Sequence, residues 1–111
     1  LNLLVKALAT QDYPQALSYL YFPPDSPAWD VSTLRQSFRE FWESYDAMFH
    51  DHRARLSQWT NVTHKDANTW DLQQVLLDSE DEQDWALLLQ VELARVRTNE
   101  TQILILERIV S

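Results

Sequence analysis

The spacing of apolar residues changes once along this chain, and that change limits the architectures open to it. Before residue 52 the apolar side chains recur at steps of three and four, the period of amphipathic helices. Beyond it they mostly alternate, the period of β-strands. A helical half followed by a stranded half favours an α+β domain over an all-helical repeat, which residues 12–17 alone would also fit.

Three helices are predicted in the first half of the chain. The first covers residues 1–8, and the second begins near Pro14, because proline suits the first turn of a helix. A proline-rich segment, residues 22–27, separates it from a third helix over residues 31–49, which Asp30 or Ser32 can cap. The apolar stripe of this third helix consists of Val31, Leu34, Phe38, Phe41, Trp42, Tyr45, Met48 and Phe49.

The second half predicts strands joined by short polar turns. Hairpins in succession form an antiparallel meander, so we expect a four-stranded antiparallel sheet. With no glycine in the sequence, its turns must rest on Asn, Asp and Ser. The predicted strands are residues 53–63, 70–77, 85–97 and 102–110.

The last two predicted strands are apolar at both odd and even positions. An antiparallel sheet with one solvated face would alternate with polar residues. We therefore expect the helices to cover one face, and a second copy of the chain or a neighbouring domain to cover the other. The alternative is a strongly curved sheet with a few exposed Leu and Ile. The expected anchors of the outer interface are Trp59, Leu87, Leu89, Val91, Ile103 and Ile105.

Charge and composition exclude several functions. The 111 residues carry 9 Lys plus Arg against 17 Asp plus Glu, a net charge of −8, which argues against nucleic acid and anionic membranes as partners. Without glycine there is no phosphate-binding loop, and without cysteine no thiol catalysis or disulfide. No apolar run is long enough to insert into a membrane. Residues 1–111 fit one acidic domain, and a start at Leu1 without Met is expected of part of a longer protein.

Candidate chemical sites are weak. Residues 50–52, His-Asp-His, could hold a metal but lack a third ligand, and they equally fit a helix terminus. The acidic residues 78–84 could hold calcium, but a solvated hairpin end has the same composition. Asp46 and Asp71 are candidate acid–base groups beside aromatic residues, or plain surface carboxylates. We expect no catalytic residue, metal or cofactor.

Three stretches of the chain resemble the nuclear transport factor 2-like, or cystatin-like, superfamily. Residues 8–17 are similar to its opening helical pattern, residues 31–42 to its long helix and residues 102–109 to its final strand. The resemblance implies helices packed on a curved four-stranded antiparallel sheet, with a cone-shaped pocket between the two layers. It also implies that dimerisation through the sheet is common. Residues expected near such a pocket are Trp42, Tyr45, Asp46 and Trp70.

Two functions follow as expectations. The first is a non-catalytic protein-interaction or dimerisation module of a larger protein, which binds a protein partner or a second copy through the outer sheet face. The second is a cone that binds a small-molecule ligand, in the manner of isomerases or dehydratases of the superfamily, in the pocket between helices and sheet.

Overall fold

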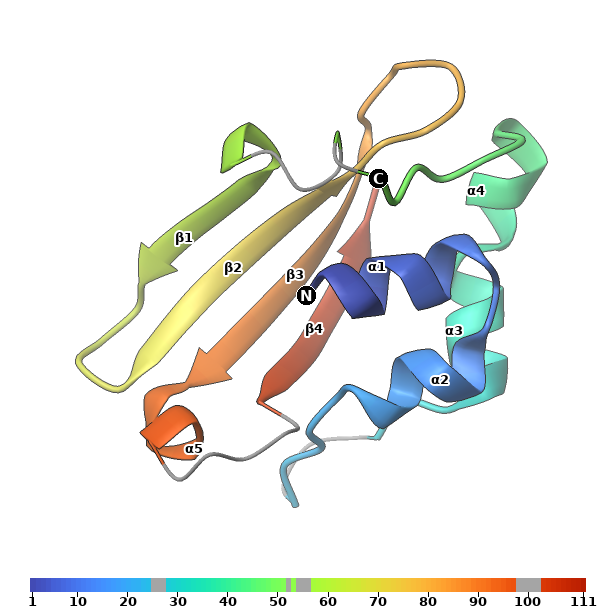
Figure 1. Cartoon of the computed structure of the whole chain (residues 1–111). Coiled ribbons are helices and arrows are strands. Elements are labelled where there is room, and N and C mark those ends of the chain that lie inside the picture. The colour runs from blue at the N-terminus through green and yellow to red at the C-terminus, as the bar shows by residue number, and fades with distance from the viewer. Residues whose placement is uncertain (25–27, 52, 54–56, 98–102) are drawn as a thin grey trace.

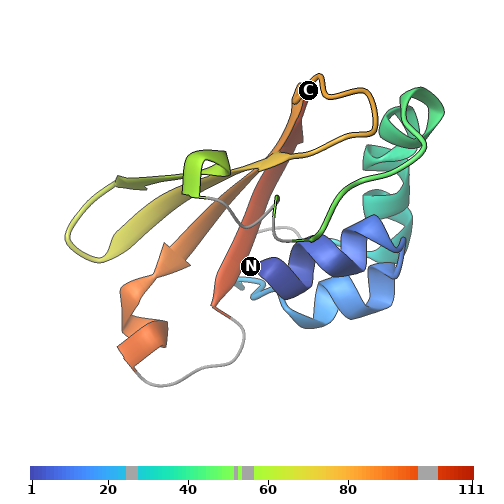
Figure 2. The same cartoon turned by 45° about the horizontal axis from the view of Figure 1, so that its top comes forward.

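The computed structural model describes residues 1–24, 28–51, 53, 57–97 and 103–111. Helices precede an antiparallel sheet of four strands, so the predicted α+β class is confirmed (Figure 1). The view in Figure 2 separates two layers, with helices α1 to α4 on one side of the sheet. The core lies between these layers, around Phe38, Phe41 and the inward side chains of the central strands.

Local signals define where the first helices begin and end. Helix α1 covers Asn2–Ala9 and helix α2 covers Tyr13–Ser18, with Pro14 in its first turn. Asp12 caps α2, because its carboxylate accepts a hydrogen bond of 3.4 Å from the Gln15 backbone N–H. Between the two helices, Gln11 has a positive φ of 57°, a conformation usually left to glycine.

The long third helix of the prediction is divided and shorter. Helix α3 covers Val31–Ser37 and is capped by Asp30, as predicted, whereas helix α4 covers only Arg39–Ser44. Beyond it the chain is extended and pairs with the end of the sheet: the Phe49 N–H donates to the Leu77 carbonyl at 2.9 Å. These tertiary hydrogen bonds replace the helical ones, while the apolar stripe stays buried at Tyr45 and Met48.

The strands run in the order β1-β2-β3-β4, each antiparallel to its neighbour, which confirms the predicted meander. Strand β2 is close to its predicted bounds, but β1 does not start at residue 53 and is preceded by a 3-10 turn, η2 (Ser57–Trp59). Residues 54–56 and the predicted turn 98–101 lie outside the described residues. The strands are β1 (Thr60–His64), β2 (Thr69–Leu76), β3 (Trp85–Glu92) and β4 (Leu104–Val110).

Strand β3 ends earlier than predicted. The expected strand ran to residue 97, but residues Leu93–Arg97 form a short helix, α5. Glu92 pairs with Thr69, the first residue of β2, so β3 has no further partner on that side. The chain then turns, and the Leu93 N–H donates to the Asn68 carbonyl at 2.8 Å.

The expected face of the interface anchors is wrong for the three residues on β3. Leu87, Leu89 and Val91 have exposed fractions of 0%, 1% and 7%, because they face the helices and belong to the core. A β-bulge between Leu88 and Leu89 shifts the register with β4 and places Ile105 opposite Gln90, on the outer side.

The outer face is mixed in polarity and not apolar throughout. Asp71, Gln73 and Gln90 interrupt it, and the Gln90 side chain donates to the Asp71 carboxylate at 3.2 Å. Its apolar members include Leu88 and Ile105, both half-buried. Such a face can meet solvent without the second cover that the sequence led us to expect.

Candidate functional site

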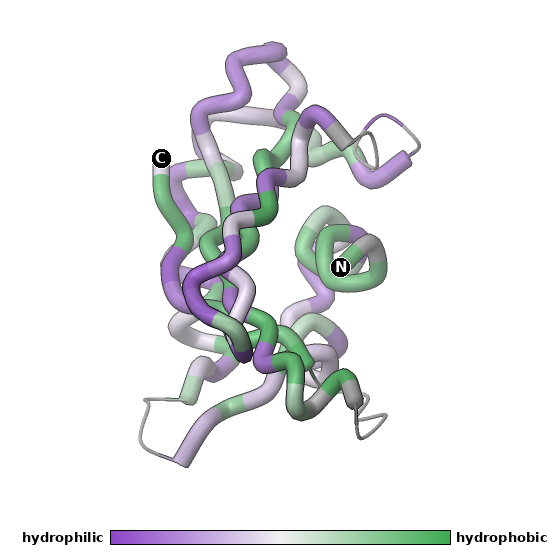
Figure 3. Tube along the Cα trace, turned by 90° about the vertical axis from the view of Figure 1, so that its left-hand side faces the viewer, coloured by the Kyte–Doolittle hydropathy of each residue, from purple (hydrophilic) through white to green (hydrophobic). Residues whose placement is uncertain are grey.

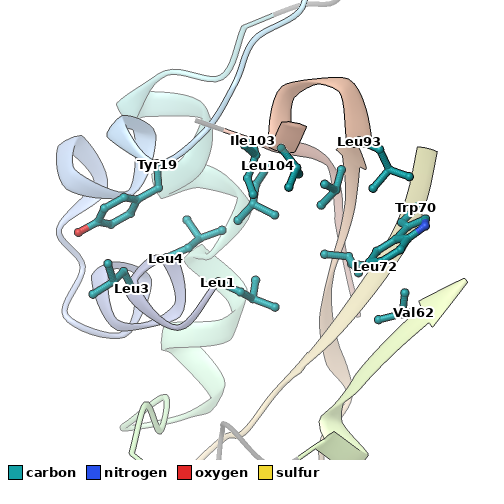
Figure 4. Close-up of a pocket in the computed structure, with 12 residues that line it drawn as sticks. Leu1, Leu3, Leu4, Tyr19, Val62, Trp70, Leu72, Leu93, Ile103 and Leu104 are labelled. Atoms are coloured by element: carbon teal, nitrogen blue, oxygen red, sulfur yellow. The ribbon is translucent and has the colours of Figure 1, made fainter. Parts of the chain in front are cut away.

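An apolar hollow opens between α1 and the inner face of the sheet. It has a volume of about 490 Å³, and Figure 4 shows side chains of the two layers on its opposite walls (Figure 4). The residues that line it are Leu1, Leu3, Leu4, Tyr19, Val62, Trp70, Leu72, Val91, Leu93, Val96, Ile103 and Leu104.

The hollow exists because the sheet is wider than the helix layer. Val91 and Leu104, on β3 and β4, are buried, whereas Val62 and Trp70, on β1 and β2, are 50% and 37% exposed. Figure 3 views the molecule from the side of β1, and the mostly hydrophobic α1 lies apart from the strands in this view (Figure 3). The inner face of β1 and β2 therefore continues past the helices that would cover it.

The large exposed apolar side chains of the described residues gather at this one place. They are Leu3, Val62, Trp70 and Val96, with exposed fractions of 60%, 50%, 37% and 44%, and all four line the hollow. Exposed apolar residues scattered singly need no explanation, but a contiguous group around a concavity is typical of a binding surface.

Few polar groups reach the hollow. The Tyr19 hydroxyl accepts a hydrogen bond of 2.7 Å from the Gln15 side-chain amide. The indole of Trp70 stacks against the ring of His64, with centroids 5.0 Å apart and planes 9° from parallel. No side chain among the twelve lining residues is a carboxylate, an imidazole, an amine or a guanidinium. The lining is therefore suited to bind hydrocarbon, with the Tyr19 hydroxyl and the Trp70 indole as its polar side-chain groups.

The four expected pocket residues do not converge. Trp70 lines the hollow, but the Trp42 indole N–H donates to the Tyr13 hydroxyl at 3.2 Å, beside a separate depression on the helix layer. The buried Tyr45 hydroxyl donates to Glu82, and the exposed Asp46 donates its backbone N–H to Ser79. The early end of α4 explains this, because residues 45 and 46 follow the chain towards the β2–β3 loop.

The remaining expected anchors are also divided. Ile103, like Val91, lines the hollow on the inner side, whereas Ile105 is on the outer face. Trp59 lies half-buried in η2, beside a different depression that Phe49 and Arg53 also line. Thus only two of these six residues, Val91 and Ile103, contribute to the hollow.

The other candidate sites serve structure. Asp51 forms an ion pair with Arg53 at 2.8 Å, while His52 lies outside the described residues. In the acidic loop, the Asp78 carboxylate accepts backbone N–H groups and is 2% exposed. The described part of the chain holds no cluster of three or more His, Asp or Glu suited to a metal ion. Nor does it contain a helix long and apolar enough to cross a bilayer.

A family model described as a domain of unknown function, DUF3516, matches residues 2–109. The chain belongs to this family. No curated protein and no solved structure matches it.

Sequence reasoning missed Leu3, Val62 and Val96. One signal was available: Leu3 is apolar but lies off the helical stripe of Leu4 and Leu8. Val62 likewise is the one apolar residue of Thr60–His64. An isolated apolar residue in a polar context suggests a surface site, but the two become neighbours only when the sheet folds under α1.

Proposed function

We propose that this domain is a non-catalytic protein-interaction module that binds through the apolar hollow rather than through the outer sheet face. The observation that carries the proposal is the clustering of Leu3, Val62, Trp70 and Val96 around one concavity. Burying such side chains against a partner gains roughly 25 cal/mol per Å² of apolar surface.

The partner is a protein segment with apolar anchor residues and basic neighbours. Two features support this choice. The exposed apolar side chains around the hollow come from four elements, α1, β1, β2 and α5, which suits a chain of side chains more than one small molecule. The net charge of −8 attracts basic segments and disfavours acidic ones.

The arrangement is also the reason to propose a nuclear transport factor 2-like cone. Helices lie on one face of a four-stranded antiparallel sheet, and the opening between them is the hollow. In this proposal the interaction surface is the mouth of the cone.

Peptides selected from a displayed random library test the proposal, with Leu3→Asp as the decisive variant. Leu3 is 60% exposed at the second position of α1, where an acidic residue is compatible with the helix. We expect the selected peptides to combine apolar and basic residues. Their affinity for the Leu3→Asp variant should be at least about tenfold lower than for the unchanged chain, because binding would bury the new carboxylate.

Ser32→Asp is the matched control. Ser32 is exposed at the second position of α3, so it receives the same charge in an equivalent helical place, away from the hollow. Peptides that bind both variants equally well, or a library that yields no binder, would contradict the proposal.

A second candidate function is the binding of a small apolar ligand. A volume of about 490 Å³ falls within the range of small-molecule pockets, about 300–1,000 Å³. Titration with an anilinonaphthalene sulfonate dye, followed by displacement with a long-chain fatty acid, measures this directly. Saturable binding that Leu3→Asp abolishes, without selection of any peptide, would favour the ligand.

A further inference from the structure

The two borders of the sheet differ. Along β4 the Tyr21 N–H donates to the Leu104 carbonyl at 2.7 Å, and the Trp29 indole N–H donates to the Leu106 carbonyl at 2.8 Å. Along β1 no described residue pairs with the outer side. Figure 1 shows β1 at the border of the sheet, away from the helices.

The register identifies which backbone groups of β1 point outward. The Lys65 N–H donates to the Thr69 carbonyl at 3.0 Å, so the backbone of Lys65 faces β2. In an antiparallel ladder alternate residues face the same way. Thr63 and Asn61 therefore also face β2, and the N–H and C=O groups of Thr60, Val62 and His64 face away from the sheet.

This border lacks the usual protection. Natural edge strands avoid pairing by means of charged side chains, proline or bulges. The five residues of β1, Thr-Asn-Val-Thr-His, include no Lys, Arg, Asp, Glu or proline, and its register with β2 is regular. Val62, at its centre, is 50% exposed.

We propose that β1 pairs in antiparallel fashion with β1 of a second copy of this chain, with Val62 opposite Val62. In this register Thr60 lies opposite His64, and the outward-facing backbone groups of both strands meet as hydrogen-bonded pairs. Asn61 lies opposite Thr63, on the outer face, where both side chains are polar and exposed. The strand is thus complementary to itself over its whole length.

The composition of β1 does not oppose a second copy at this particular border. The chain has a net charge of −8, yet the strand that would meet its copy carries no acidic residue. Within the paired strands, therefore, no charged residue of one copy faces a like charge of the other. The remaining repulsion between copies acts at long range, and salt screens it over about 8 Å at physiological ionic strength.

Pairing would also change the surroundings of Val62. The two valines would meet on the inner face, and the two sheets would continue into one another. The hollows would then lie on one continuous concave surface, with both mouths on the same side. The inference goes beyond the proposed function, since the hollow can bind a partner in a monomer or in a dimer.

Analytical ultracentrifugation from micromolar to millimolar concentration tests the pairing by comparing the dimerisation of the unchanged chain with that of the Val62→Pro variant. Proline removes only the N–H that faces outward, so the hydrogen bonds from β1 to β2 remain. We expect the unchanged chain to dimerise, more strongly at higher salt, and Val62→Pro to weaken dimerisation by roughly tenfold or more. Circular dichroism checks that the variant keeps its fold.

Trp70→Ala separates the border from the hollow. It removes apolar surface beside Val62 and the ring that stacks on His64, but leaves the outward-facing N–H and C=O groups of β1 in place, so we expect dimerisation within about threefold of the original. A chain that stays monomeric throughout overturns the proposal. So does a dimer that Trp70→Ala abolishes and Val62→Pro does not, and neither result depends on peptide binding at the hollow.

A cysteine test gives an independent readout, because the chain has no cysteine of its own. Val62→Cys should form a disulfide-linked dimer under mild oxidation, since facing residues of antiparallel strands lie about 5.5 Å apart at Cα. Gln73→Cys, exposed on the neighbouring strand β2, is the control and should stay monomeric. Equal cross-linking of both variants would overturn the proposed register.

Discussion

The Tyr45 hydroxyl donates a hydrogen bond of 2.8 Å to the Glu82 carboxylate and so ties the end of α4 to the loop between β2 and β3. This contact raises the pKa of Tyr45 from 10.0 to about 12, through the hydrogen bond first, then through burial and the charges of Glu82, Asp78 and Asp84. A carboxylate acceptor favours the neutral hydroxyl, because the phenolate could not donate.

The first prediction concerns alkaline pH. Because the pKa of Tyr45 is higher in the folded chain than in the unfolded one, its stabilising effect is complete below pH 10 and lost as pH rises through about 12. Ultraviolet titration of tyrosinate should show a step near pH 12 that Tyr45→Phe removes. A titration curve that is the same in the variant would contradict this assignment.

A second prediction concerns Asp78, which holds the β2–β3 loop. Its carboxylate accepts N–H groups from Glu80 at 2.9 Å, Glu82 at 3.0 Å and Gln83 at 2.8 Å. Asp78→Asn replaces one acceptor with a donor, so we expect a loss of about 2 kcal/mol in the free energy of unfolding by urea. The exposed Asp84→Asn, in the same loop, is the control and should change it by less than about 0.5 kcal/mol.

A third prediction uses the turn after α1. The Gln11 N–H donates to Leu8 at 3.1 Å and the Asp12 N–H to Ala7 at 2.8 Å, the pattern of a Schellman motif, whose left-handed position is usually glycine. Gln11→Gly should raise the free energy of unfolding by about 0.5–1 kcal/mol, because φ of 57° costs glycine little. Thr10→Gly, at a φ of −94°, should lower it instead.

A fourth prediction tests which side of β3 faces the core. Leu89 is 1% exposed among the helices, so Leu89→Ala should cost about 2–5 kcal/mol in thermal or urea unfolding. Its neighbour Leu88 is half-buried on the outer face, and Leu88→Ala should cost about 1 kcal/mol. Equal costs would show that the assignment of faces is wrong.

Local chemistry made much of the fold predictable. Asp30 caps α3 through a hydrogen bond of 2.7 Å to the Thr33 N–H, a contact between residues three apart. The alternation within residues 70–77 is equally local, and so are the polar turns of the meander. Such features depend on residues a few positions apart in the sequence, so the sequence alone is enough to predict them.

The features that set the binding surfaces are not local. The apolar spacing through Tyr45 fits a helix, but the Phe49–Leu77 hydrogen bond, formed across the fold, requires an extended chain. The bulge at Leu88 and Leu89 reverses the parity of β4, and nothing in an apolar run marks a shift of one residue. The hollow was unpredictable for the same reason, since Leu3 and Val62 line one hollow only after the sheet and the helices have packed together.

The absence of glycine also had a consequence that residue types alone did not reveal. Turns were expected to rest on Asn, Asp and Ser, and of the positive φ values among the described residues one falls on Asp81, as expected, and two on glutamines, Gln11 and Gln83. In the β2–β3 loop the Gln83 side chain donates to Asp81, and both residues are held over Asp78. In this loop, hydrogen bonds therefore stabilise the positive-φ conformations of Asp81 and Gln83, which glycine would adopt without such support.

The Trp29 indole, bonded to the Leu106 carbonyl, limits how large an assembly of this domain can become. A sheet with two accessible borders can recruit copies without end, which is the geometry of fibrils. Here the first half of the border at β4 is already occupied from within the same chain, because Tyr21 donates to the Leu104 carbonyl and Trp29 to the Leu106 carbonyl. The proposed strand pairing through β1 would therefore end after a single addition, and the contacts of Tyr21 and Trp29 with β4 favour a finite pair over a growing filament.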